Sequence, residues 1–343
     1  MENLNYSHLS KRRYTIVMSL FFLLLLITLT VSPLIGPTRI SLIKAFSSSP
    51  GASDNIDANI LFLARLPRIF LAAVAGAALA VAGAVFQAIL RNDLAAPVTL
   101  GVSGGAAFGA VVAIRLGIVF SFLGISSVSI FAFMGSLLAL AIIFSLVRAR
   151  QGELPTAVLL LAGVTVNFFF ASLVMLVHYL SDVTQSFQIV RWLMGGLDVM
   201  DFQTTLSICP LIFPGILILM YIARDLNLIS SGVESALSRG VDVVPIQFTG
   251  LLVASMLTGI VVAVSGPISF VGLVVPHIVR LLIGPDHRLL IPATMFFGAG
   301  FLVICDTAAR TLIAPTEIPV GVITAIIGGP FFFWLLKKQQ GTR

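Results

Sequence analysis

The sequence predicts an all-α polytopic membrane protein with about ten transmembrane helices. Of its 343 residues, 58% are apolar and only 10% are charged, and the mean hydropathy is +1.10. A spanning helix needs about 20 predominantly apolar residues, and windows of that length recur along the whole chain. No polar connection between them is long enough to fold separately, so we expect residues 1–343 to form a single transmembrane domain.

The first apolar run follows a basic cluster, Lys11, Arg12 and Arg13, and so resembles a secretory signal. The run is too long for a signal core and no A-x-A cleavage site follows it, so we expect an uncleaved first span. The other spans follow the remaining apolar windows in chain order, and the start of the fourth is left open within 116–134. The predicted spans are residues 14–35, 64–90, 95–115, 128–147, 154–181, 202–223, 245–265, 268–283, 289–312 and 318–336.

Small residues dominate the second and third spans. An alanine- and glycine-rich run extends over 72–84, and Gly101, Gly105 and Gly109 recur at a spacing of four. Small side chains at this spacing let helix backbones approach closely in a bilayer. The pattern suits a rigid body that rocks during transport, and it is equally typical of ordinary membrane packing.

Basic residues predict the orientation of the chain. When the ten spans are threaded in order, most of the 20 Lys and Arg residues fall on the side of the N-terminus. Because loops rich in Lys and Arg remain in the cytoplasm, we expect both termini and the polar segment 224–245 to be cytoplasmic. The net charge of +6 follows from this topology, and no basic run or aromatic motif indicates a nucleic-acid partner.

The sequence contains no motif for catalysis. It has no G-x-x-x-x-G-K-[ST] phosphate loop, no HExxH, no G-x-S-x-G and no clustered His, Cys and carboxylate set. We therefore expect no enzyme activity, no nucleotide hydrolysis by this chain itself, no metal site and no cofactor. Cys209 and Cys305 lie in predicted spans, far from any partner of metal-ligand spacing, and we expect them to be packing residues.

An ion-coupled secondary transporter is the alternative function, since such carriers are also polytopic and contain broken helices. They place ionisable groups at mid-membrane, where a polar side chain is costly and therefore indicates a role. The candidates within the predicted spans are His178, Asn167, Gln87 and Asp306. They do not form the series that a proton relay requires, and His178 lies near the outer end of its span.

Residues 224–245 form a polar, helix-like island among the spans. Ser231 and Glu234 have the spacing of a capping box, and Gly240 suits a helix C-terminus. The apolar residues of the island, namely Val233, Ala236, Leu237 and Val241, fall on one helical face. The pattern predicts a short amphipathic helix. It either joins two spans or serves as a coupling helix gripped by a cytoplasmic motor.

Several sequence blocks between Arg65 and Trp334 occur in an order that is typical of one family. The blocks are Arg65-Leu66-Pro67-Arg68, Leu100-Gly101-Val102-Ser103, Leu161-Ala162-Gly163-Val164 with Asn167, Gly266-Pro267-Ile268-Ser269-Phe270-Val271-Gly272-Leu273 with Pro276-His277, and Glu317-Ile318-Pro319-Val320-Gly321 with Gly328-Gly329-Pro330. In this order they resemble the permease subunits of FecCD-type ABC importers, which move iron-siderophores, haem and cobalamin across the inner membrane. The resemblance implies a type II ABC importer permease fold.

The resemblance also implies partners and a location. Two copies of the chain would assemble with two copies of an ATPase subunit. A periplasmic or lipid-anchored binding protein would deliver the substrate. The whole would sit in the lipid bilayer of a bacterial cytoplasmic membrane. The chelate is expected to be an iron-siderophore, with haem or cobalamin equally compatible with the motifs.

The resemblance assigns roles to three groups of residues. The coupling group would sit in a cleft of the ATPase, and the docking group would bind acidic residues of the binding protein. The pathway group would line the route between two permease copies. Arg65 and Arg68 could instead anchor the end of the second span, and the pathway residues could instead pack helices. The coupling group is Gly232, Glu234, Ala236 and Gly240, the docking group is Arg65, Arg68 and Arg310, and the pathway group is Gly163, Asn167 and Ser172.

The chain departs from the family pattern at a few positions. Asp93 stands where proline is usual, and Ala96 stands where an acidic residue is common. In the island, Ser231, Val233 and Arg239 replace the more usual leucine, acidic residue and leucine. These departures affect the details of the contact with the motor.

Overall fold

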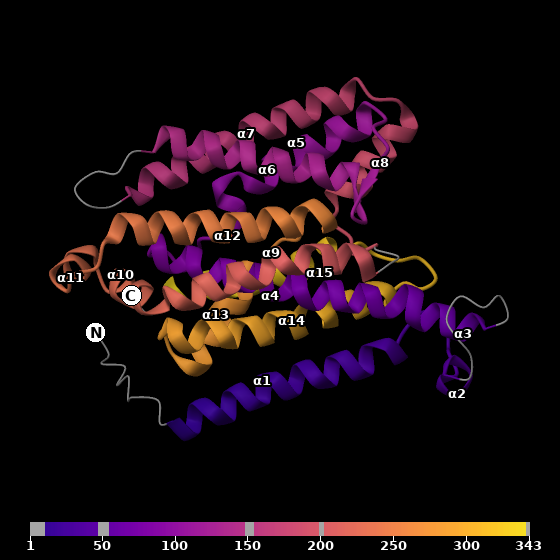
Figure 1. The fold of residues 1–343 in the computed structure, drawn as a ribbon, viewed down its shortest axis with the longest axis horizontal. Helices are drawn as coiled ribbons and strands as arrows, with labels where there is room; N and C mark the ends of the chain where they lie inside the picture. Colours follow the sequence, from indigo (N-terminus) through magenta and orange to yellow (C-terminus); the bar gives the residue numbers. More distant parts are fainter. Residues whose placement is uncertain (1–10, 47–54, 148–153, 199–201, 341–343) are drawn as a thin grey trace.

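The computed structural model describes residues 11–46, 55–147, 154–198 and 202–340, which fold into an elongated bundle of helices lying side by side (Figure 1). Two short β-strands form a hairpin, and 3-10 and π-helical segments extend some helices. The elements are α1 Lys11–Val31, η1 Ser32–Leu34, α2 Leu42–Ala45, α3 Ile56–Asn59, η2 Ile60–Arg65, α4 Leu66–Ile89, η3 Pro97–Leu100, α5 Val102–Arg115, β1 Ser121–Phe122, β2 Ile125–Ser126, α6 Ser127–Leu146, α7 Thr156–Tyr179, α8 Val183–Leu193, α9 Phe202–Tyr221, α10 Ala223–Ser230, α11 Val233–Ser238, α12 Val243–Ser265, α13 Val271–Ile283, α14 His287–Thr311 and α15 Val320–Gln340.

Helix α4 lies at the centre of the bundle and is buried along almost its whole length. It contacts α9, α12, α13 and α14. Its alanine- and glycine-rich sequence explains this position, because small side chains allow backbones to come close. A Cβ atom added at Gly76 would overlap the carbonyl oxygen of Gly298 in α14, and one at Gly83 would overlap the carbonyl oxygen of Gly272 in α13.

Helices α5, α6 and α7 form a neighbouring group along one side of the bundle (Figure 1). Gly105 of α5 and Gly135 of α6 meet so closely that a Cβ on either would overlap the carbonyl oxygen of the other. The third span was predicted from residue 95, yet α5 begins only at Val102. The preceding η3 carries a proline at its start, and Gly101 has φ +70, a left-handed conformation that ends one helical segment and starts another.

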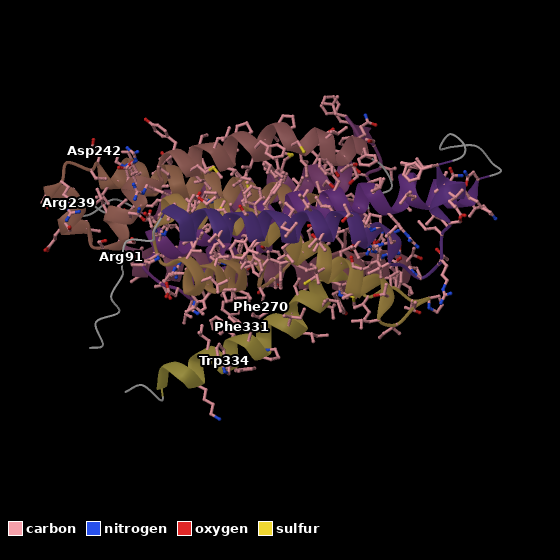
Figure 2. The ribbon with its side chains drawn as sticks, turned by 90° about the horizontal axis from the view of Figure 1, so that it is seen from below. Arg91, Arg239, Asp242, Phe270, Phe331 and Trp334 are labelled. Atoms are coloured by element: carbon pink, nitrogen blue, oxygen red, sulfur yellow. The ribbon has the colours of Figure 1, made fainter. Side chains whose placement is uncertain are left out.

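The helices α1 and α15 lie at the periphery. Helix α1 packs mainly on α14. Helix α15 contacts α13 and α14 and diverges from the body of the bundle toward its C-terminal end, where Phe331 and Trp334 lie (Figure 2). Helix α1 begins, and α15 ends, at the end of the bundle that carries α10 and α11 (Figure 1). We call this end the α11 end, and the opposite end, where α3 and α8 lie, the α3 end.

Within the described residues, seven helices are long and apolar enough to cross a membrane. The shorter apolar helices α5, α13 and α15 lie in three further predicted ranges, so the count of about ten spans remains a prediction. Most helix ends differ from the predicted ends by only a few residues. The second span differs more, because α3, η2 and α4 form one continuous helix that begins at Ile56 rather than near residue 64.

Candidate functional site

The polar island lies at the α11 end, where α10 and α11 project beyond the long helices (Figure 1). The prediction of a single capped helix there is wrong, since two short helices meet at Gly232. Gly232 has φ +130, a backbone conformation that residues other than glycine rarely adopt. It is the N-cap of α11 and provides no side-chain hydrogen bond to the helix. Ser231 follows α10 as its C-cap, and its hydroxyl donates to the carbonyl oxygen of Asn227 (2.9 Å), so it forms no capping box with Glu234.

One face of α11 packs against its neighbours. Val233 and Ala236 are buried in a small apolar cluster with Ile229 of α10 and Val243 of α12. Leu237 was expected on this face but is 44% exposed and lies outside this cluster. The cluster fixes α11 to α10 and to the start of α12, and we refer to residues 223–242 as the coupling segment.

The four coupling candidates have different environments. Glu234 and Gly240 are exposed at the tip, Gly232 is half-buried, and Ala236 is fully buried against α10 and α12. Space is open around the Cα atoms of Gly232 and Gly240, and Gly240 also has a positive φ of +81. The surface that a partner could touch therefore includes Glu234 and Gly240 but not the side chain of Ala236. Figure 2 shows Arg239 and Asp242 at the same tip.

The coupling segment is also hydrogen-bonded to the loop before α14. The side-chain nitrogen of Asn227 donates to Asp286 Oδ1 (2.7 Å). The side-chain oxygen of Asn227 accepts from the backbone N–H of His287 (2.7 Å) and lies 2.8 Å from His287 Nδ1. Asp286 in turn caps α14 by accepting from the backbone N–H of Arg288. Hydrogen bonds from the Arg288 side chain lower the pKa of Asp286 to about 2, so it stays ionised near neutral pH.

The α3 end carries a buried ion-pair cluster centred on Asp306 of α14. This carboxylate is fully buried and accepts from Arg68 Nε (2.7 Å) and Arg310 Nε (3.0 Å). Arg68 also pairs with Glu317 (2.6 Å), and more loosely with Asp198 (3.6 Å). The cluster therefore joins α4, α14 and the segments before α9 and α15.

The docking role that the resemblance implies requires exposed arginines at a rim, and the structure contradicts this exposure. Arg65, Arg68 and Arg310 are buried, because their guanidinium groups serve as internal donors. Arg65 donates to the carbonyl oxygens of Pro33 (2.7 Å) and Thr38 (2.5 Å). The cluster reaches the surface instead through Glu317 and Asp198, whose side chains are 42% and 48% exposed. Exposed Arg191 also pairs with Asp198 (2.9 Å).

The three pathway candidates lie on two faces of α7, with Gly163 and Asn167 on the face toward η3 and α5 and Ser172 on the opposite, exposed face. Gly163 is buried against Gly101, since a Cβ at Gly101 would lie 3.0 Å from the Gly163 carbonyl oxygen. Asn167 is half-buried and faces Gly104 of α5. Ser172 lies on the exposed face, and its hydroxyl donates back to the helix. That face also exposes large apolar side chains, namely Leu161, Phe168, Phe169, Met175, Leu176 and Tyr179.

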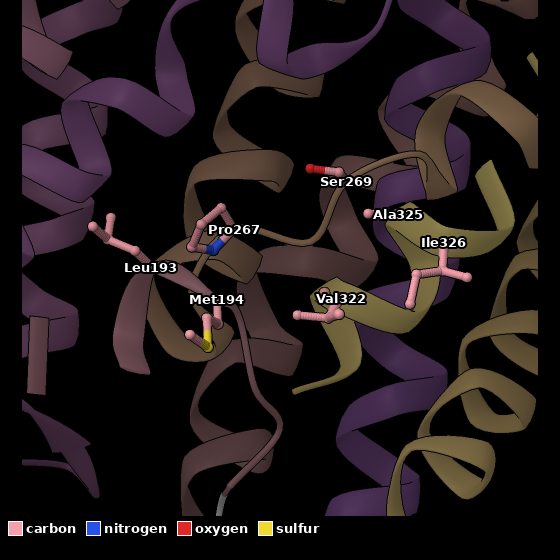
Figure 3. Close-up of a pocket in the computed structure, with 8 residues that line it drawn as sticks. Leu193, Met194, Pro267, Ser269, Val322, Ala325 and Ile326 are labelled. Carbon is pink, nitrogen blue, oxygen red and sulfur yellow. The ribbon is translucent and has the colours of Figure 1, made fainter. Parts of the chain in front are cut away.

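A cavity of about 460 Å³ lies between the end of α8, the break between α12 and α13, and the start of α15. In Figure 3, Leu193, Met194 and Pro267 lie on one side of it, and Val322, Ala325 and Ile326 of α15 lie on the other. Among the described residues, no charged side chain lines it, so those residues would not hold an anion or a cation by ion pairing. The lining residues are Leu193, Met194, Pro267, Ser269, Gly321, Val322, Ala325 and Ile326.

Sequence analysis missed α8 and the contacts of Asn227. Helix α8 had a readable signal, because Asp182 and Gln185 have the spacing of a capping box and form both of its hydrogen bonds. The bond between Asn227 and Asp286 joins positions 59 residues apart and leaves no local sequence signal. Among the described residues, no group of three or more His, Cys, Asp or Glu side chains is placed to hold a metal ion.

These features define a polytopic helical membrane protein with the projecting coupling segment at one end and a buried ion-pair cluster at the other. A model of the FecCD transport family matches residues 23–338, and the chain belongs to that family. It is therefore a membrane-transport permease of the ABC type.

Known relatives agree with this assignment. The chain is 44% identical over 284 residues to the hemin transport system permease HmuU of Yersinia pestis, covering 81% of this chain and 83% of that protein. It is 42% identical over 280 residues to the cobalamin import system permease of Halobacterium salinarum, covering 80% and 73%. A solved structure of a metal-chelate type ABC transporter in an inward-facing conformation matches with a TM-score of 0.82 and 33% identity, covering 95% and 99%.

Proposed function

We propose that this chain is the permease subunit of an ATP-driven importer for a metal chelate, and that a separate subunit hydrolyses the ATP. The observation that carries the proposal is the coupling segment, an exposed pair of short helices fixed to the bundle by buried apolar contacts and by Asn227. A surface that transmits force must not move independently of the body behind it. The relatives named for hemin and cobalamin transport support the metal-chelate substrate class.

The favoured substrate is an iron-siderophore, and haem or cobalamin are the other candidates. The absence of charged side chains among the described residues that line the cavity beside α15 supports a route that tolerates different chelates rather than one that selects by ion pairing. Selectivity would then belong to the binding protein. Ser172, on the exposed face of α7, is the pathway candidate best placed to meet a passing chelate, with Gly163 and Asn167 positioning that face from behind.

The proposed assembly contains two copies of this chain, two ATPase subunits and a binding protein. The large apolar side chains along α7 and the divergent end of α15 support a second copy as well as lipid on these faces. The α11 end would face the cytoplasm, and both termini would lie there. This orientation follows from the distribution of Lys and Arg along the sequence.

Docking of the binding protein would involve Arg65, Arg68 and Arg310 through an exchange of partners. Because these arginines are buried, an incoming carboxylate would first replace half-exposed Glu317 or Asp198 at Arg68. We expect Glu317→Gln to raise the association rate of the binding protein, and we expect added salt to reduce the gain. An unchanged rate would contradict a docking role for this cluster, and measurement by surface plasmon resonance at two salt concentrations distinguishes the outcomes.

The substrate is tested by uptake of labelled ferric hydroxamate siderophore, haem and cobalamin in cells that lack the gene and in cells where it is restored. Loss and rescue of one compound identifies the substrate. The variants Glu234→Lys and Gly240→Pro should insert normally into the membrane but fail to support that uptake, because they change the exposed tip. Normal uptake by both variants would contradict the coupling role of this segment.

A further inference from the structure

We propose that Asn227 is a positioning residue that locks the coupling segment to the start of α14, so that a displacement of the coupling segment moves α14 with it. The inference rests on the proposed function and names the internal contact through which a movement driven by the ATPase would be transmitted to α14. Neither the family pattern quoted for the island nor the four coupling candidates include Asn227.

The half-buried side chain of Asn227 makes several hydrogen bonds to the start of α14. Both ends of its amide are used, one as a donor to Asp286 Oδ1 (2.7 Å) and the other as an acceptor from the backbone N–H of His287 (2.7 Å). The amide therefore holds both the N-cap residue and the first residue of α14. Asp286 is held from the other side by Arg288 (2.7 Å). The lock is thus continuous from α10 through Asp286 into the first turn of α14.

Rigid elements extend the lock in both directions. On one side, the cluster of Ile229, Val233, Ala236 and Val243 fixes the exposed tip to α10. On the other side, α14 has 25 residues, which at the usual rise corresponds to a length of about 37 Å. Its far end carries Asp306, at the centre of the ion-pair cluster. One helix therefore joins the coupling segment to the cluster where docking is proposed.

A purely structural role for Asn227 makes a different prediction. Loss of a local cap or turn would lower the amount of folded protein or its assembly with the ATPase, and both activities would fall together. Loss of a mechanical lock would instead leave ATP hydrolysis intact and reduce the transport obtained from it. The number of chelate molecules moved per ATP is therefore the informative readout.

The first test compares Asn227→Ala with wild type in proteoliposomes containing the full transporter, with its ATPase and binding protein. The probe is whichever of labelled ferric hydroxamate, haem and cobalamin the wild type transports. We expect chelate moved per ATP to fall about fivefold or more, with ATPase activity retained. Ser145→Ala, which removes an exposed hydroxyl that donates to the Ile142 carbonyl oxygen within α6 and lies outside the coupling segment, is the control and should behave as wild type. Equal coupling in Asn227→Ala and wild type would overturn the proposal.

A swap of the two side chains gives a rescue test. Asn227→Asp alone places two carboxylates against each other and should uncouple transport. Combined with Asp286→Asn, it restores a donor and an acceptor across the same gap, and asparagine remains able to cap α14. We expect the double variant to recover most of the coupling. A double variant no better than the worse single variant would contradict the lock.

A covalent link tests the lock directly. In a background with Cys209→Ala and Cys305→Ala, the pair Asn227→Cys and Asp286→Cys should transport poorly when reduced and regain transport when oxidised to a disulfide. Transport that stops on oxidation and returns on reduction would show that α10 and α14 must separate during the cycle. Failure of the disulfide to form would show that these side chains do not meet. Either result would overturn the proposal.

The wild-type control separates this inference from the function on which it rests. If the wild-type transporter moves none of the three chelates with ATP, the proposed function fails. If the wild type transports one of them and Asn227→Ala remains fully coupled, the proposed function stands and only the lock fails.

Discussion

Replacing Asp306 with alanine should destabilise the protein far more than replacing its neighbour Glu317. Asp306 is fully buried between Arg68 and Arg310, at 2.7 and 3.0 Å. Removing one member of a buried ion pair typically costs about 3–5 kcal/mol, because the remaining charge is left without its partner. In Asp306→Ala, Arg310 would retain only the hydroxyl groups of Ser32 and Thr307. We therefore expect a loss of about 3–5 kcal/mol.

Glu317→Ala is the matched control. Its side chain is 42% exposed, and Arg68 keeps Asp306 when Glu317 is removed. Exposed pairs contribute about 0–1 kcal/mol, so the control should lose no more than that. Free energies of unfolding can be measured by titrating sodium dodecyl sulfate into mixed micelles and following far-UV circular dichroism. Equal losses in the two variants would refute the view that the cluster is a buried structural unit organised by Asp306.

Three further predictions follow from particular contacts. Glu234→Lys should leave membrane insertion and unfolding midpoint unchanged but abolish ATP-dependent uptake; parallel loss of folded protein would contradict a role at the surface. Gly83→Ala should lower the free energy of unfolding by about 1–3 kcal/mol or more, because the added Cβ would overlap the Gly272 carbonyl oxygen. The control Gly329→Ala places its Cβ in open space and should leave that free energy unchanged. Similar unfolding free energies for the two variants would contradict the close packing of α4 on α13. In the folded protein the pKa of Asp286 is lowered to about 2 from 3.8, so the stability that this carboxylate contributes is present above pH 3.8 and is lost as pH falls toward 2. Asp286→Asn should therefore flatten that part of the curve of unfolding free energy against pH. An unchanged slope would contradict the hydrogen bonds of Asp286 to Arg288 and Asn227.

The small-residue patterns predicted close helix packing well, because their effect is local and geometric. The run over 72–84 lies in the central helix α4, and Gly105 and Gly109 do face α6 at backbone contact. The start of α5 was misplaced because hydropathy alone does not register the turn at Pro97 and Gly101. Helix α8 was missed because an apolar window of membrane length cannot detect an 11-residue amphipathic helix.

The polar residues were harder to place than the apolar ones. The arginines at 65, 68 and 310 were expected at an exposed rim because the family resemblance implied that they dock a binding protein. Arg310 lies four residues after Asp306 on the same helix, a spacing that indicates an ion pair from the sequence alone. The burial of Arg65 and Arg68 instead depends on partners distant in sequence, namely backbone carbonyl oxygens and Asp306, which hydrophobic periodicity does not identify. The same holds for Asn227, whose partners lie in the loop before α14. The location of the coupling segment was predicted, but its attachment was not.

The most direct test of the account is reconstitution of the purified chain into proteoliposomes, with and without its ATPase subunit. The measurement is uptake of the labelled chelate identified in cells, under ATP, under a proton gradient and under a sodium gradient. We predict uptake only when the ATPase, the binding protein and ATP are all present, and we predict that Glu234→Lys abolishes it. Uptake by the chain alone, driven by either ion gradient, would contradict the account and favour an ion-coupled secondary transporter.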